Sequence, residues 1–316
     1  MSLIRHPIPQ RLRTVMLLVV LCLLPGTVLY AWQFGVVVWL QAFWCVLFAL
    51  GFEAALLRLR GHDVRKGLSD LSWLVLGLIL ARALPLMVPL WMIALASFAA
   101  LALCKHASGG LGRNRLNPAM VGLGVVAICF YQQLYPAPSN HAPWTAALDA
   151  KAVLLQQLQL APRLDLDAFA GATQLAQNEF THVTHNLSGY GYIAGGLLLA
   201  LLRVIRIEIP LAMLMSTVLL CMAAGHSLQE AVYNLSLGGY FFTAFFIATD
   251  PVTSPNTRAG RILFGVTIGT LTELIREFGL YADGLCFAVL AGNLLVPQID
   301  RLVLRMQRPW YAAASA

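Results

Sequence analysis

The chain has 316 residues, of which 59% are hydrophobic and 11% are charged. Soluble domains are close to half apolar and about one quarter charged, so this composition excludes an ordinary soluble domain and predicts a chain surrounded by the lipid bilayer. The net charge of +7 could suit a nucleic-acid-binding protein, but the basic residues are dispersed over short loops. Because no basic patch forms, nucleic acid is excluded as a partner.

Apolar runs follow one another along the chain, bounded by charges, Pro or Gly. A helix needs about 20 mainly apolar residues to cross a bilayer, and about ten runs approach that length. The sequence therefore predicts an all-α polytopic membrane fold with about ten transmembrane helices. The predicted spans are 14–31, 33–57, 68–84, 86–104, 118–134, 188–207, 209–225, 231–249, 261–278 and 283–303.

The basic residues predict how these spans are oriented. With the N-terminus inside, alternate loops on the inner side hold 17 of the 21 Lys and Arg residues. Only Arg82, Lys151, Arg163 and Arg276 remain for the outer side. This bias satisfies the positive-inside rule and predicts a bacterial inner-membrane protein with both termini in the cytoplasm.

A long polar loop divides the predicted spans into two groups of equal number. The predicted organisation is an N-terminal membrane half at 1–131, a periplasmic loop at 132–187 and a C-terminal membrane half at 188–316. Five helices in each half would make any internal repeat an inverted one, although the two halves share no convincing sequence similarity. Two inner segments rich in Gly, Pro and Asn, 108–122 and 249–261, interrupt the apolar pattern. Irregular backbone at membrane depth must be buried in protein or line a cavity.

The long outer loop contains a short run of small residues that ends in a hydroxyl group. Asp167 is followed by Ala-Phe-Ala, and then Gly171 and Ala172 precede Thr173. The small side chains leave the Thr173 hydroxyl open to another molecule. Taken alone, such a run is typical of an ordinary loop turn.

The loop motif occurs together with the inner segments GGLGRNRLNP and ATDPVTSPNTRAG, and the three resemble the RnfD/NqrB family. This family comprises membrane subunits of the Rnf electron-transport complex and of the sodium-pumping NADH:quinone reductase, and the resemblance covers nearly the whole chain. It implies that a flavin transferase joins FMN to Thr173 through a phosphoester, with Asp167 as a recognition or metal-positioning residue. Family members often have Ser where this chain has Ala170, so the motif departs from the family pattern there.

The resemblance also implies a second, noncovalent flavin. A Gly-Arg-Asn-x-x-Asn segment of the related reductase subunit contributes to a riboflavin site, and Asn114 and Asn117 occupy the matching positions here. Amide side chains both donate and accept hydrogen bonds, which suits the mixed edge of a flavin ring. The alternative is that these residues cap the helix that begins near Pro118, and both interpretations remain open.

The second interrupted segment contains Asp250, Thr253 and Ser254 between two prolines, Pro251 and Pro255. Because Pro cannot continue a helix, the prolines predict a break here. The pattern favours a structural bend over a ligand site.

Two carboxylates fall inside predicted spans. Charged side chains are costly at membrane depth, so Glu53 and Glu273 are candidates for an ion path. The alternative is pairing with nearby Arg residues or a position at the headgroups, and Glu273 lies beside Arg276 and one turn from Glu277. No metal site is predicted, since His182 and His185 lack further ligands nearby in the sequence.

The resemblance implies an electron-carrying component of an ion-translocating complex, in which covalent FMN and a second flavin pass electrons between ferredoxin and NAD, coupled to Na⁺ or H⁺ transport. Some bacterial relatives instead keep a redox-sensing regulator reduced, and the residues do not choose between the two. The chain lacks a dinucleotide fingerprint and a cysteine cluster, so iron–sulfur, NADH-binding and other flavin-bearing subunits are expected partners. The rival interpretation is a solute or ion transporter or channel with no redox group.

Overall fold

The computed structural model describes residues 12–86, 88–134, 150–160, 187–279 and 284–307. Every regular element in this part of the chain is a helix, and no strand occurs in it. The N-terminal elements are α1 (Leu12–Phe34), α2 (Val37–Leu59), α3 (Val64–Leu68), α4 (Ser72–Ala83), α5 (Leu90–Phe98), the π-helix η1 (Ala99–His106), α6 (Pro118–Cys129), α7 (Tyr131–Leu134) and α8 (Ala150–Gln157). The C-terminal elements are α9 (Leu187–Leu201), α10 (Glu208–Ala223), α11 (Leu228–Ser236), α12 (Tyr240–Phe242), the π-helix η5 (Thr243–Ile247), α13 (Arg258–Phe278) and α14 (Leu285–Met306).

Three of these helices, α1, α2 and α14, are long and apolar enough to cross a membrane. Five further apolar helical stretches are shorter, and the shortest of them have only 12 residues. The all-helical membrane class predicted from the sequence is therefore confirmed. The count of about ten spans, the division at 131 and 187 and the inverted repeat remain predictions.

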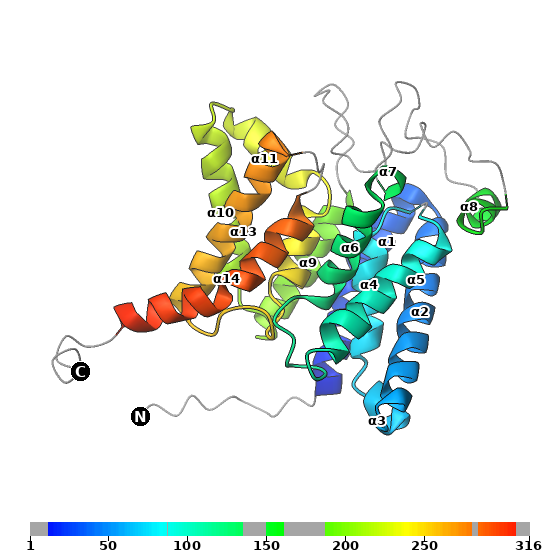
Figure 1. Cartoon of the computed structure of the whole chain (residues 1–316). Helices are drawn as coiled ribbons and strands as arrows, with labels where there is room; N and C mark the ends of the chain where they lie inside the picture. The colour runs from blue at the N-terminus through cyan, green and yellow to red at the C-terminus, as the bar shows by residue number, and fades with distance from the viewer. Residues whose placement is uncertain (1–11, 87, 135–149, 161–186, 280–283, 308–316) are drawn as a thin grey trace, which may run out of the picture.

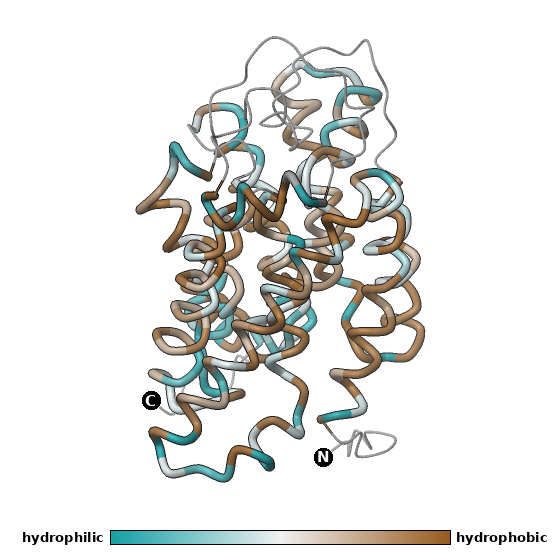
Figure 2. The backbone as a smooth tube through the Cα atoms, turned by 90° about the vertical axis from the view of Figure 1, so that its right-hand side faces the viewer, coloured by the Kyte–Doolittle hydropathy of each residue, from teal (hydrophilic) through white to brown (hydrophobic). Residues whose placement is uncertain are grey.

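The outward faces of the long helices are apolar, as expected for contact with lipid. Along the helix bodies the tube in Figure 2 is mostly hydrophobic, and hydrophilic residues gather toward the ends and the connecting segments. A soluble protein rarely exposes continuous apolar surface of this extent. Exposed apolar side chains on α1, α2 and α10 include Leu17, Leu21, Leu24, Val28, Trp39, Phe43, Leu47, Leu211, Met215 and Leu219.

Several predicted spans contain more than one element. The predicted span 231–249 is divided into α11, α12 and η5, because the chain turns at Gly238, whose φ of 61° suits glycine far better than other residues. The predicted span 86–104 begins as α5 and continues as η1. η1 and η5 each lead into one of the two interrupted segments, and such widened turns are frequent at functional sites.

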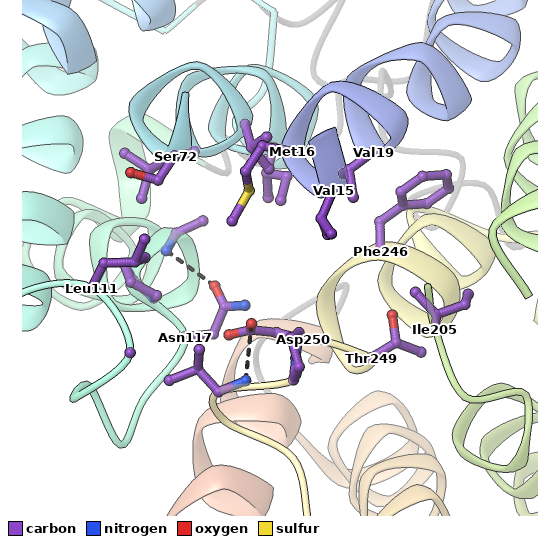
Figure 3. A pocket seen from close by; sticks show the side chains of 18 of the residues that line it. Val15, Met16, Val19, Ser72, Leu111, Asn117, Ile205, Phe246, Thr249 and Asp250 are labelled. Atoms are coloured by element: carbon purple, nitrogen blue, oxygen red, sulfur yellow. Dashed lines mark hydrogen bonds between the residues drawn. The ribbon is translucent and has the colours of Figure 1, made fainter. Parts of the chain in front are cut away.

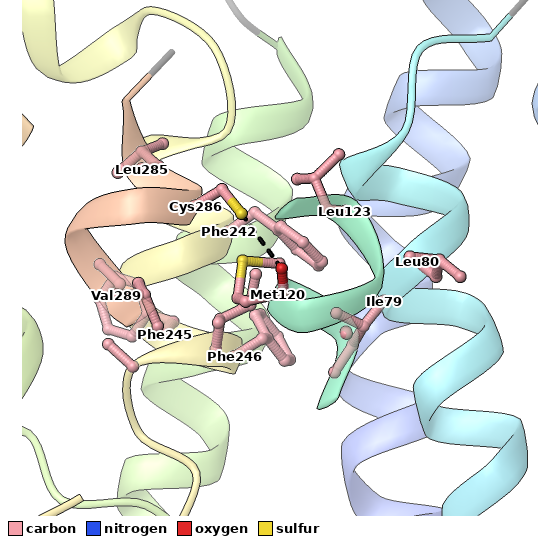
Figure 4. Packing of buried hydrophobic residues seen from close by; sticks show 14 of the residues in the cluster. Ile79, Leu80, Met120, Leu123, Phe242, Phe245, Phe246, Leu285, Cys286 and Val289 are labelled. Atoms are coloured by element: carbon pink, nitrogen blue, oxygen red, sulfur yellow. Dashed lines mark hydrogen bonds between the residues drawn. The ribbon is translucent and has the colours of Figure 1, made fainter. Parts of the chain in front are cut away.

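The two membrane halves are packed tightly together. α9 of the C-terminal half lies against α1 of the N-terminal half, where a side chain at Gly195 would collide with the carbonyl oxygen of Cys22. Small residues at such a seam let two membrane helices approach closely. Met120 and Leu123 of α6 also join a buried core with Phe242, Phe245 and Phe246, and Figure 4 shows this packing with Val289 and Cys286 of α14.

The helices define two ends of the molecule. In Figure 1, α3, the start of α1 and the end of α14 lie at one end, here called the inner end after the predicted orientation. α7, α8 and α11 lie at the opposite, outer end.

Candidate functional site

A cavity of about 330 Å³ opens near the inner end, between the start of α1, α4, the two interrupted segments and the chain after α9. Its walls are mainly apolar, and Figure 3 shows Val15 and Met16 of α1 facing Asn117 and Asp250 across it. Ligand sites in proteins are commonly of this kind, with apolar walls and a few convergent polar groups. The polar side chains that line it are Ser72, Lys105, Asn114, Asn117, Thr249 and Asp250. The expectation that the interrupted segments line a cavity is therefore confirmed.

The first interrupted segment is shaped by glycine and ends in a capped helix. Gly109, Gly110 and Gly112 all have positive φ, which glycine adopts without steric penalty. The Asn117 side chain accepts hydrogen bonds from the N–H groups of Ala119 (3.1 Å) and Met120 (3.3 Å), and Pro118 occupies the first turn of α6. The capping interpretation of Asn117 is confirmed, and the same residue also lines the cavity.

Asn114 has a different environment. Its Nδ2 donates to the carbonyl of Leu116 at 2.9 Å, whereas its Oδ1 is buried and has no hydrogen-bond partner. An unsatisfied buried acceptor costs about 1–3 kcal/mol. Because Asn114 lines the cavity, its free oxygen is available to a ligand that carries a hydrogen-bond donor.

Asn293 of α14 joins the two interrupted segments. Its Oδ1 accepts from the N–H of Asn117 at 3.0 Å, and its Nδ2 donates to the carbonyl of Thr253 at 3.1 Å. The side chain is buried. The sequence analysis missed Asn293, since a lone Asn in an apolar helix does not reveal partners that are distant along the chain.

Asp250 forms the expected bend in the second interrupted segment. Its carboxylate accepts from the N–H of Val252 (3.3 Å) and the hydroxyl of Thr253 (3.0 Å), and its carbonyl accepts from the N–H of Ser254 (3.1 Å). Burial raises the pKa of Asp250, while these donors to the carboxylate lower it. The bend is confirmed, and the structure adds that Asp250 also lines the cavity.

Glu53 lies in a buried charged group, here called the Glu53 cluster, with Lys105, His106, Ser72 and Arg60. Lys105 Nζ is 2.7 Å from Glu53 Oε1 and donates to Ser72 Oγ at 2.7 Å. His106 Nε2 is 3.1 Å from Glu53 Oε2, and Arg60 donates to the His106 carbonyl at 2.9 Å. The expected pairing with Arg is wrong for Glu53, because its direct partners are Lys105 and His106. Lys105 also lines the cavity, so the Glu53 cluster forms part of its wall.

Glu273 lies in a second buried group, here called the Glu273 cluster, with Cys221, Asn234, Arg276 and Tyr240. Glu273 Oε1 accepts from Asn234 Nδ2 at 2.7 Å and from the Cys221 thiol at 2.9 Å. Arg276, the partner suggested by the sequence, donates instead to Asn234 Oδ1 at 3.1 Å and lies over the ring of Tyr240. The structure therefore does not bring the two ion-path candidates together, since none of this cluster lines the cavity.

The predicted flavinylation motif, with Asp167, Gly171, Ala172 and Thr173, lies outside the described residues. His182 and His185 lie outside them as well. Within the described ranges, no group of three or more His, Cys, Asp and Glu side chains could hold a metal ion.

Comparison with known proteins connects these features. The model of the NQR2, RnfD, RnfE family matches residues 7–307. A membrane-complex protein of Klebsiella pneumoniae, named as one of the subunits of the ion-translocating oxidoreductase complex, is 37% identical over 323 residues, covering 90% of this chain and 91% of that protein. The proteins of the same name from Aeromonas hydrophila (36% over 327 residues, 93% of both chains) and Marinobacter nauticus (32% over 327 residues, 95% and 93%) are similar as well. The chain belongs to the NQR2, RnfD, RnfE family.

Proposed function

We propose that this chain is the flavin-carrying membrane component of an ion-translocating oxidoreductase complex, with FMN bound covalently to Thr173 and a second flavin in the cavity. Family membership and the names of the relatives support a place in such a complex. The sequence motif from Asp167 to Thr173 supports the covalent attachment. A flavin supplies reversible electron transfer, and the protein binds it and tunes it.

The observation that carries the second site is the buried Oδ1 of Asn114, which lacks a partner and belongs to a residue of the cavity wall. A flavin ring carries an imide N–H, which is a donor of the kind that this oxygen needs. The apolar side chains of Val15, Met16 and Phe246 suit the flat hydrophobic body of the ring. The residues present therefore fit a noncovalent flavin such as riboflavin, with Asn114 as the binding residue and Asn117 holding the shape of the wall.

The remaining assignments follow from the same proposal. A flavin transferase recognises Asp167, Gly171 and Ala172 and modifies Thr173 in the periplasm. Iron–sulfur and NADH-binding subunits deliver electrons between ferredoxin and NAD, and the complex moves Na⁺ or H⁺ across the bacterial inner membrane. Glu53 and Glu273 are the buried carboxylates available to an ion path in this chain.

In-gel flavin fluorescence tests the covalent site. The full chain is coexpressed with its complex and flavin transferase, purified from membranes and run on a denaturing gel. We expect a fluorescent band in the wild type that is lost in Thr173→Ala and kept in Thr181→Ala, a second Thr of the same loop that lies outside the motif. A wild type without covalent flavin would overturn the proposal and favour a transporter or channel.

The cavity is tested separately by extracting noncovalent flavin from the same complexes. Asn114→Leu removes the free acceptor, so we expect a several-fold loss of extractable flavin with the covalent band unchanged. Arg115→Leu, at an exposed position of the same segment, is the matched control. Equal flavin content in the Asn114→Leu variant and the wild type would place the second flavin elsewhere.

A further inference from the structure

Glu273 belongs to a polar seam between α10 and α13, away from the cavity. In one layer of the seam, Thr217 contacts the hydroxyl of Tyr240 and donates to the carbonyl of Gly269 at 3.2 Å. Cys221 and Glu273 follow four residues later on each helix, which is about one helical turn. The cluster lies toward the outer end, near α11, whereas the cavity lies near the inner end.

The two oxygens of Glu273 have unequal surroundings. Oε1 accepts both of the hydrogen bonds, from Asn234 and Cys221. Oε2 is buried and has no hydrogen-bond partner, and the whole residue is only 6% exposed. Burying an ionised carboxylate without a compensating charge is very unfavourable. A proton on Oε2 removes that charge and leaves Oε1 free to accept its two bonds.

Among the described residues, no neighbouring element supplies a cation that forms an ion pair with this carboxylate. α10 contributes the Cys221 thiol, α11 contributes the neutral Asn234, and α12 contributes Tyr240, whose hydroxyl is bound to Thr217 and the carbonyl of Met213. On α13, Arg276 directs its guanidinium N–H groups to the carbonyl (3.0 Å) and Oδ1 (3.1 Å) of Asn234 and to the carbonyl of Leu237 (3.4 Å). α14 begins beside this level with the uncharged residues 285–289.

We propose that Glu273 is a proton-binding site, at which Oε2 takes up and releases one proton in the α10–α13 seam. Asn234 and Arg276 are only partly buried, so the site lies a single side-chain layer below the protein surface. Uptake or release of the proton changes the charge of the seam by one unit. The site depends on this geometry alone and not on the flavins proposed above.

Glu53 provides an internal contrast, because both of its oxygens are occupied. Oε1 binds the Lys105 ammonium, and Oε2 binds His106. A paired carboxylate retains its charge, so the same reagent should distinguish the two glutamates of one chain.

Labelling with a hydrophobic carbodiimide tests the proposal, since this reagent adds to a protonated carboxyl group and not to a carboxylate. The wild-type chain is labelled within its complex in native membranes over a range of pH, and the modified peptides are located by mass spectrometry. We expect labelling of Glu273 that falls as the pH rises, because the reactive acid form loses its proton. Glu53 should stay unlabelled throughout.

Two variants control the assignment. Glu273→Gln should remove the label, and Glu277→Gln, at an exposed position one turn further along α13, should retain it. Absence of label on Glu273 at every pH would overturn the proposal, as would its protection by Na⁺ at constant pH, which would indicate a metal-cation site. Labelling requires no flavin, so its failure is distinct from failure of the Thr173 experiment.

Discussion

The two halves of the protein each bury a glutamate, and they compensate it in opposite ways. Glu53 contacts an ammonium and an imidazole, and Lys105 receives a further hydrogen-bond partner in Ser72. Glu273 receives hydrogen bonds only from an amide and a thiol, and one of its oxygens has no partner. Burial is nearly the same for both, at 2% and 6% exposed. The counter-charge therefore decides which carboxylate is fixed in its ionised form.

The position of each cluster gives the difference a functional meaning. The Glu53 cluster reaches the cavity through Lys105, so the ion pair is a permanent part of a ligand-sized wall. The Glu273 cluster lies between two packed helices and touches no part of that cavity. A fixed charge pair suits the positioning of a bound group, whereas an uncompensated carboxyl suits exchange of a proton.

The largest expected effect comes from removing the counter-charge of Glu53. Lys105→Met leaves a buried carboxylate with His106 as its remaining partner, and breaking a buried pair typically lowers the free energy of unfolding by about 3–5 kcal/mol. We expect a clear drop in the thermal unfolding temperature of the purified complex. Lys66→Met, at an exposed site in α3, should leave that temperature nearly unchanged.

A double variant makes the same test stricter. Glu53→Gln combined with Lys105→Met removes both charges, so it should recover much of the stability lost in Lys105→Met. If the double variant is as unstable as the single one, lost packing and not the unpaired charge explains the effect.

The comparison of the clusters also shows what the sequence could predict. Glu53 and Glu273 stand out because each is a charge within an apolar run, and the helices follow from the same runs. Their partners could not be read in this way, since Lys105 is 52 residues from Glu53 and only the packing of η1 against α2 brings them together. For Glu273 the local signal was misleading, because the adjacent Arg276 bonds to Asn234 of α11.

The cavity follows the same division between local and distant information. The cap of α6 was accessible from the sequence Asn117-Pro118, because a cap uses only neighbouring residues. The contact of Asn117 with Asn293 joins residues 176 positions apart, which no spacing rule predicts. The break before α12 was missed because Gly238 and Gly239 lie in an otherwise continuous apolar run.

An intermediate effect separates the two glutamates directly. Glu53→Gln leaves the Lys105 ammonium buried without its counter-ion and should lower the free energy of unfolding by roughly 2–3 kcal/mol. Glu273→Gln keeps an oxygen for Asn234 and Cys221 and loses no ion pair, so its cost should be below about 1 kcal/mol. Thermal unfolding of the two variants under the same conditions measures the difference. Equal losses would mean that the two carboxyl groups carry the same charge.

The smallest effect concerns a single hydrogen bond in each cluster. A bond between neutral groups contributes about 0.5–1.5 kcal/mol, and a bond to a charged group about 1.5–3 kcal/mol. Ser72→Ala removes the acceptor of the Lys105 ammonium, and Cys221→Ala removes a donor to Glu273. With Glu273 protonated as proposed, Cys221→Ala should be the milder change and Cys221→Ser nearly neutral, both by thermal unfolding. If Cys221→Ala instead destabilises the protein as much as Ser72→Ala does, Glu273 holds a negative charge that its neighbours stabilise.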